Sequence, residues 1–136
     1  MPEASVGAPA LIEWGVASLA LPGEAESGDR HLVTPVGTGV LVAVVDGLGH
    51  GAEAASAAKA AVAALERHAT ESPAPLLERC HRALKGTRGA VMSVAAFSRH
   101  DRSMTWVGVG NVEGLLFLDQ QAQLRIERGT GRIDRG

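Results

Sequence analysis

The residues best suited to chemistry lie where an apolar run meets a glycine-rich turn. Residues 40–45 are apolar and rich in β-branched side chains, and Asp46 follows them directly. Glycines then alternate at Gly47, Gly49 and Gly51. A carboxylate that ends a buried strand must be paired or must bind a metal, because an isolated buried charge is costly. Asp46 is therefore the first candidate site residue.

The same turn offers a second oxygen ligand, and the chain offers a second acid. Gly47 allows the backbone to bend sharply, so that its carbonyl can join the Asp46 carboxylate. Mg²⁺ and Mn²⁺ take such oxygen ligands and retain bound waters. Asp29 also lies between a glycine and a short strand. If the two strands are neighbours, both acids can reach one metal centre; taken alone, Asp29 is typical of an exposed turn carboxylate.

The glycine turn also satisfies a dinucleotide-binding pattern. Residues 47–52, GLGHGA, match G-x-G-x-x-A, with a strand before them and a helix after them. Asp46 would place a negative charge beside a pyrophosphate, and the later strands form a meander rather than a further βαβ unit. A nucleotide-binding domain is kept as a third hypothesis, behind two that use a metal or a partner protein.

Hydrophobic periodicity predicts the elements that must position these residues. We expect strands at 11–21, 31–36, 40–45, 90–98, 104–109, 114–118 and 124–127, and helices over 52–68 and from 72–73 to 86. A turn over 108–113 should connect two of these strands, while 128–136 shows no core pattern. Strands, then two helices, then strands favour an α+β layered domain. Residues 1–10 are expected to be a flexible N-terminal arm and residues 11–136 a single domain.

Composition narrows the function classes. The chain has 136 residues, 46% of them hydrophobic, and a net charge of −2, which suits one globular domain and gives no electrostatic case for nucleic acid. No apolar run approaches the ~20 residues of a membrane span, and the N-terminus lacks a signal-peptide pattern. The single cysteine, Cys80, excludes an intramolecular disulfide and indicates a cytoplasmic protein. Its apolar helical surroundings predict a packed thiol rather than a nucleophile.

Four segments in order carry a family resemblance. They are SGDRHLV at 27–33, VAVVDGLGHGAEAASAA at 42–58, RGAVMSVAAF at 88–97 and MTWVGVGNVEGLLF at 104–117. Together they resemble the bacterial type 2C-like (PPM) serine/threonine phosphatases, within them the SpoIIE-like branch, and especially the small stand-alone phosphatases of stressosome and sigma-factor pathways. The resemblance covers about 11–118 and leaves a tail, 119–136, unmatched.

The resemblance implies a fold and a reaction. The family folds as a β-sandwich flanked by helices, in α-β-β-α layers, with two Mn²⁺ or Mg²⁺ ions at one edge. It implies that Asp46 bridges both ions, that the Gly47 carbonyl binds one, and that Asp29 lies near them. A metal-activated water then hydrolyses phosphoserine or phosphothreonine, here on a regulator of the anti-anti-sigma or stressosome type.

Two further residues receive candidate roles. His50 follows Asp46 by four residues, an offset from the turn histidine proposed as general acid in some family members; it could protonate the leaving group or be an exposed turn residue. Arg30 could meet a substrate phosphate or be a solvated charge. Residues 108–111, GVGN, resemble a glycine turn close to the active-site edge, with a structural role as the default.

The resemblance ends before the remaining metal ligands of the family. Asp119 and Asp134 lack the expected strand-then-glycine context. The chain is therefore expected to lack the last strands of the family domain, to assemble two metals poorly and to show little phosphatase activity. The alternative function is a catalytically deficient binding module of phosphatase fold that only docks a partner.

Overall fold

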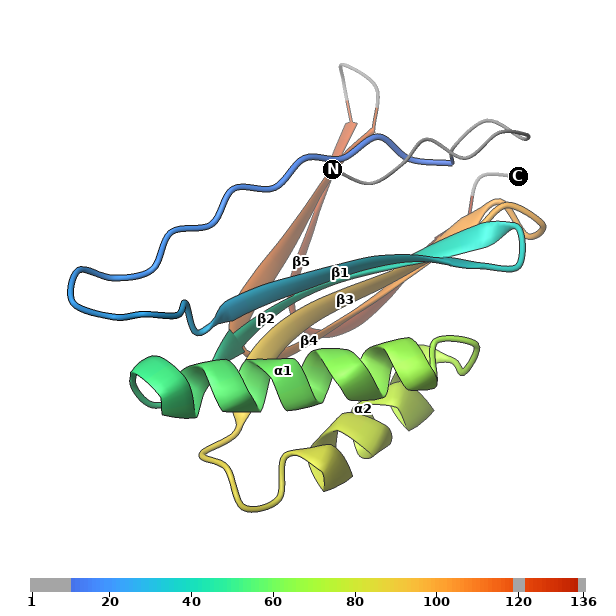
Figure 1. Cartoon of the computed structure of the whole chain (residues 1–136). Helices are drawn as coiled ribbons and strands as arrows, with labels where there is room; N and C mark the ends of the chain where they lie inside the picture. The colour runs from blue at the N-terminus through green and yellow to red at the C-terminus, as the bar shows by residue number, and fades with distance from the viewer. Residues whose placement is uncertain (1–10, 119–121, 135–136) are drawn as a thin grey trace, which may run out of the picture.

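The computed structural model describes residues 11–118 and 122–134, in which five strands form one antiparallel sheet (Figure 1). Each strand pairs with its neighbour in sequence, in the order β1-β2-β3-β4-β5. The strands are β1 (Asp29–Val36), β2 (Gly39–Gly47), β3 (Ala90–Ser98), β4 (Ser103–Leu118) and β5 (Ala122–Asp134). Two helices, α1 (Gly51–Arg67) and α2 (Pro73–Ala83), are inserted between β2 and β3. The predicted α+β class is confirmed.

Both helices cover the same face of the sheet, and the core lies between the helices and that face (Figure 1). The residues that α1 buries are all alanines except the last, namely Ala54, Ala55, Ala57, Ala58, Ala61, Ala64 and Leu65. Such small side chains let the helix axis lie close to the sheet. From α2, Leu76 and Cys80 enter the same core, so the predicted packed thiol at Cys80 is confirmed.

The opposite face of the sheet, called the open face here, carries no helix among the described residues. Side chains alternate along a strand. Leu41, Ala43 and Val45 therefore enter the helix-covered core, whereas Val44 is 56% exposed on the open face. Asp46 follows the same alternation and is exposed, which corrects the expectation of a buried acid.

The β4–β5 hairpin bends over part of the open face (Figure 1). Its register shifts between Gly108 and Glu113, which is the signature of a bulge that redirects a strand. Trp106 is 6% exposed because its ring lies against Gly108 and Gly114, and its Nε1 donates a 2.7 Å hydrogen bond to Ser93 Oγ. The bend thus begins a layer on the side opposite the helices.

Three predictions about elements were wrong. Residues 11–21 form no strand: Leu19 and Leu21 are 89% and 72% exposed, and this segment does not pair with the outer edge of β1. The expected strands at 104–109 and 114–118 are one strand, because the glycines between them form a bulge rather than a turn. Residues 128–134 belong to β5, whose edge position needs no alternating core pattern.

The other elements agree closely with prediction. The helix expected over 52–68 is α1, the helix expected from 72–73 ends at Ala83, and the strand expected at 90–98 is β3. Ser72 is the N-cap of α2 and Pro73 its first residue, the position at which proline costs no hydrogen bond. Neither α1 nor α2 is long and apolar enough to cross a membrane. The arm at 1–10 lies outside the described residues.

Candidate functional site

The two candidate acids face each other across neighbouring strands. Asp29 begins β1 and is the direct register partner of Asp46 near the end of β2. The condition for a shared centre, that the two strands be neighbours, is therefore met. Both residues are exposed and lie on the open face, since their positions alternate with the core residues of their strands.

The pKa of the Asp46 carboxyl is raised above its ordinary value. The largest cause is partial shielding of the carboxylate from water, and the nearby negative charge of Asp29 and a side-chain hydrogen bond with Asp29 add to it. Two carboxylates held this close repel each other when both are ionised. A divalent cation bound between them would remove that repulsion, so the pair is chemically suited to a metal.

Where β2 ends and β1 begins, the backbone leaves room only for glycine at positions 47 and 28. Gly47 donates its N–H to the Gly28 carbonyl oxygen at 2.8 Å, and a Cβ on Gly47 would collide with the backbone oxygen of Ala54. A Cβ on Gly28 would lie 2.8 Å from the Ala54 Cβ and 3.5 Å from the Gly47 carbonyl oxygen. Gly28 therefore keeps side-chain atoms away from the carbonyl that sequence reasoning proposed as a metal ligand.

The turn after Asp46 starts helix α1 and places His50. Gly49 and Gly51 have φ values of 107° and 48°, which favour glycine. His50 is the N-cap of α1, where its carbonyl accepts the Glu53 N–H at 3.0 Å. Its imidazole is exposed and makes no capping hydrogen bond. The structure thus gives the His50 backbone a clear helix-starting role and leaves its side chain accessible to solvent.

Arg30 is not brought together with the two acids. It pairs with Val45 across the β1–β2 ladder, so its side chain leaves β1 on the helix-covered side of the sheet. Its Nε is the one buried side-chain nitrogen or oxygen in the described ranges without a hydrogen-bond partner. Its charge also helps to lower the pKa of Glu26, after the larger effect of Lys59.

Sequence reasoning missed two acids beside the glycine turn. The Glu24 carboxylate lies against the Gly51 backbone at the start of α1, although Glu24 belongs to an ordinary-looking turn in the sequence. Glu53 in the first turn of α1 forms an ion pair with Arg88, whose Nε lies 2.6 Å from Glu53 Oε1. Acids are favourable at a helix N-terminus, and that preference is the only signal the sequence carried.

The remaining candidates contribute no further acid. Over residues 11–116, whose side chains the structure describes, no group of three or more histidine, cysteine or acidic side chains could hold a metal ion. Asp119 lies outside the described residues, and the backbone of Asp134 pairs with Ser103 at the end of β5. Residues 108–111 lie within β4, where Gly110 has φ 93° and approaches Val91. The candidate metal site therefore consists of the carboxylates of Asp29 and Asp46 and the glycine backbone at Gly28 and Gly47.

Comparisons with known proteins agree on one family. The model of the family described as stage II sporulation protein E (SpoIIE) matches residues 37–133. The phosphoserine phosphatase RsbX of Bacillus subtilis is 33% identical over 94 residues, which are 69% of this chain and 47% of RsbX. The chain thus spans about half the length of that curated relative.

Solved structures share the fold. RsbX in complex with magnesium has a TM-score of 0.77 at 25% identity, over 85% of this chain and 64% of that one. A protein solved in work on the bacterial stressosome has a TM-score of 0.73 at 29% identity, over 83% and 65%. The PP2C phosphatase domain of SpoIIE from B. subtilis has a TM-score of 0.68 at 16% identity, over 84% and 40%, a likeness of fold alone. The expected type 2C phosphatase-like fold is confirmed.

Proposed function

This chain belongs to the SpoIIE family, and from that premise we propose that it is a metal-dependent protein serine/threonine phosphatase. Its substrate would be phosphoserine or phosphothreonine on a partner-switching regulator of the anti-anti-sigma or stressosome type. The phosphoserine phosphatase activity in the name of RsbX supports the reaction. The stressosome relative supports the class of partner.

The observation that carries the proposal is the cross-strand pair of Asp29 and Asp46. Two carboxylates at one sheet edge, one with a raised pKa caused partly by the other, fit a divalent cation. The Gly47 carbonyl, kept clear of side chains by Gly28, would supply a third oxygen. Mg²⁺ is supported by the magnesium complex of RsbX, and Mn²⁺ has the same ligand preferences.

The roles of the residues follow from these positions. Asp29 and Asp46 would hold the ion. When bound, the ion would lower the pKa of a water molecule and so make that water a better nucleophile toward the phosphorus. The exposed His50 imidazole would give a proton to the departing serine or threonine oxygen. Arg30 leaves its strand toward the helices, and no phosphate contact is assigned to it.

A second candidate function is docking without hydrolysis. Among the described residues, Asp29 and Asp46 belong to no larger group of histidine, cysteine or acidic side chains that could hold a metal. Two carboxylates and one carbonyl would bind a single ion weakly, and the reaction would then be slow. In that case the fold would serve to hold a phosphorylated partner rather than to dephosphorylate it.

Replacement of Asp46 by Asn tests the proposal. Phosphate release from a phosphoserine peptide with millimolar Mn²⁺, and Mn²⁺ binding by calorimetry, are measured for this chain and for Asp46→Asn. We expect the variant to lose metal binding and about a hundredfold or more in rate. The control is Asp101→Asn, an exposed aspartate in the turn between β3 and β4, at the end of β3 that lies away from the two acids.

The outcomes separate the two candidates. If the unchanged chain binds Mn²⁺ through Asp46 but releases no phosphate, the docking function replaces hydrolysis. If it binds no Mn²⁺, or if Asp101→Asn is as damaging as Asp46→Asn, the metal centre at this edge is wrong. Nucleotide binding without metal, unaffected by Asp46→Asn, would support the third hypothesis instead.

A further inference from the structure

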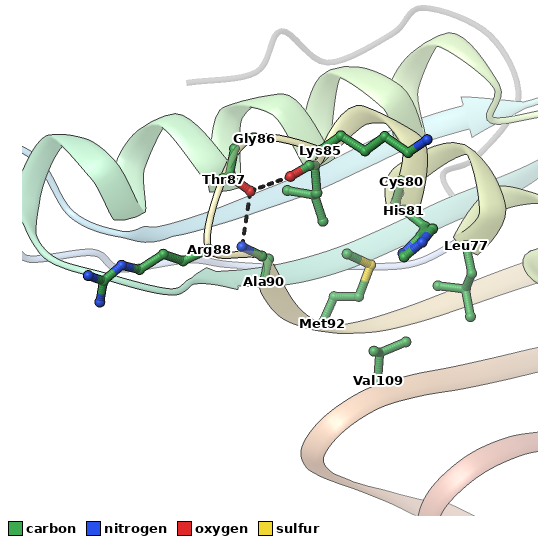
Figure 2. Close-up of a pocket in the computed structure, with 12 residues that line it drawn as sticks. Leu77, Cys80, His81, Lys85, Gly86, Thr87, Arg88, Ala90, Met92 and Val109 are labelled. Carbon is green, nitrogen blue, oxygen red and sulfur yellow. Dashed lines mark hydrogen bonds between the residues drawn. The ribbon is translucent and has the colours of Figure 1, made fainter.

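A groove of about 520 Å³ lies between the C-terminal part of α2 and the strands β3 and β4 (Figure 2). Its floor and walls are mainly apolar, formed by Leu77, Cys80, Leu84, Met92 and Val109. Val109 is 37% exposed at its outer wall, whereas Cys80 and Met92 are buried beneath it. A concave, largely apolar surface of this size accommodates one or two side chains of a partner.

The lining of this groove, called the α2 groove below, includes residues of the basic types and no acidic ones. His81, Lys85 and Arg88 line it, and no acidic residue does. The Arg88 guanidinium points away from the other side chains in Figure 2 and is paired with Glu53. Within the described residues, Lys85 and His81 form no ion pair. Lys85 therefore presents an uncompensated positive charge beside an apolar floor, with the His81 imidazole as a further polar group next to it.

The wall formed by residues 84–89 is held in shape by its own hydrogen bonds (Figure 2). Thr87 Oγ1 donates to the Leu84 carbonyl at 2.7 Å and accepts the Gly89 N–H at 3.0 Å. Gly86 and Gly89 take φ values of 86° and 94°, which allow the tight path. A groove that is already formed loses little entropy when a partner binds.

The α2 groove is contiguous with the candidate metal edge. Ala90, which lines the groove, is the register partner of Gly47, and Leu48 donates its N–H to the Gly89 carbonyl at 2.9 Å. Backbone partners in an antiparallel pair lie ~5 Å apart. The two acids lie on the open face at the end of β2, and the groove lies on the helix-covered side of the sheet at the same end of that strand. A chain crossing the edge can thus reach both.

We propose that the α2 groove binds an acidic segment of the substrate protein close to its phosphorylated residue. One apolar side chain of that segment would insert between Leu84 and Val109, and flanking carboxylates would face Lys85 and His81. This inference rests on the proposed function, since it assumes that a phosphorylated protein is the partner. It specifies which features beside the phosphate this chain recognises.

Peptide binding in the absence of metal tests the groove directly. The probes are fluorescein-labelled phosphoserine peptides rich in glutamate, with one leucine placed two to six residues after the phosphoserine, measured by anisotropy in EDTA. We expect one register to bind best, and about tenfold weaker binding when its leucine becomes serine. Lys85→Glu, and Val109→Phe, which fills the groove from its exposed wall, should each weaken binding by about tenfold as well.

The matched control is Arg67→Glu, which makes the same charge reversal at the exposed end of α1, outside the groove. It should leave the peptide affinity unchanged. Equal affinities for the unchanged chain, Lys85→Glu and Val109→Phe would overturn the proposal, as would binding that ignores the leucine. Hydrolysis of p-nitrophenyl phosphate with Mn²⁺ is measured separately: its absence contradicts the proposed phosphatase, while the result in EDTA still decides for or against the groove.

Discussion

The two faces of the sheet are built from alternate residues of the same strands, yet they have opposite character. The helix-covered face is closed by α1 and α2, with Leu41, Val45 and Val94 at most 1% exposed. The open face carries Val44 at 56% exposure and the acids Asp29 and Asp46. Strand β2 contributes residues to both faces, so a shift of its register by one residue would exchange them.

This contrast separates stability from chemistry. On the helix-covered face most of the apolar area is removed from water, and its residues fix the strands in register. On the open face the acids remain accessible to solvent and to an ion. Residues that hold the fold together and residues that do chemistry thus alternate along β2, and substitutions should affect one property without the other.

The largest expected difference is between the two faces themselves. Leu65 is fully buried in the core between α1 and the sheet, and Leu65→Ala should lower the free energy of unfolding by about 2–4 kcal/mol. Val44→Ala, on the open face, should lower it by less than about 1 kcal/mol. Urea denaturation followed by circular dichroism measures both. Similar losses for the two variants would mean that the open face is covered in solution.

A smaller effect of pH is expected on the helix-covered face. Burial raises the pKa of the Cys80 thiol to about 11, from an ordinary value of 9.0. Above pH 9 the unfolded chain loses the thiol proton while the folded chain keeps it, so stability should fall as the pH rises from 9 to 11. The slope is at most about 1.4 kcal/mol per pH unit.

Urea denaturation at a series of pH values measures this slope, and the sequence has no tyrosine to titrate in the same range. In Cys80→Ala the slope should flatten, whatever the variant loses in overall stability. An equal slope in the two proteins would contradict the burial of the thiol in solution.

The smallest effect is expected at the acids. Asp46→Asn removes one of two facing carboxylates, and since the raised pKa of Asp46 shows that its charged form is disfavoured, the variant should be slightly more stable at pH 7. The gain should not exceed about 0.5 kcal/mol, because solvent screens exposed charges. It should vanish at low pH, where Asp46 is protonated. Thermal unfolding without metal, at pH 7 and pH 3, measures it; a loss of stability at pH 7 would contradict the repulsion.

Strong local patterns made much of the fold predictable. The alanine-rich run that became α1 and the apolar run that became β3 were located within one or two residues, since propensity and periodicity agree there. Residues 11–21 carry apolar side chains too, but strand formation depends on a partner edge that no local pattern reveals. The bulge in β4 was missed for the same reason: glycines allow both a turn and a bulge, and only pairing with β5 decides.

The candidate site was predictable in part. Both acids were expected to lie close together if their strands were neighbours, and β1 and β2 do pair. The exposure of Asp46 and the orientation of Arg30 depend on which face the helices cover, and the sequence does not state it. The α2 groove joins α2, β3 and β4, and its residues share no motif, so it could be found only in three dimensions.

The order of the strands also has a kinetic consequence. Three of the four connections between neighbouring strands are short, and only β2 and β3 are joined by a long one, residues 48–89. Local hairpins form within microseconds, whereas closing the long connection requires α1 and α2 to form and dock. Asp29 and Asp46 belong to the local β1–β2 hairpin. The two acids can therefore meet early in folding, before the helices cover the other face.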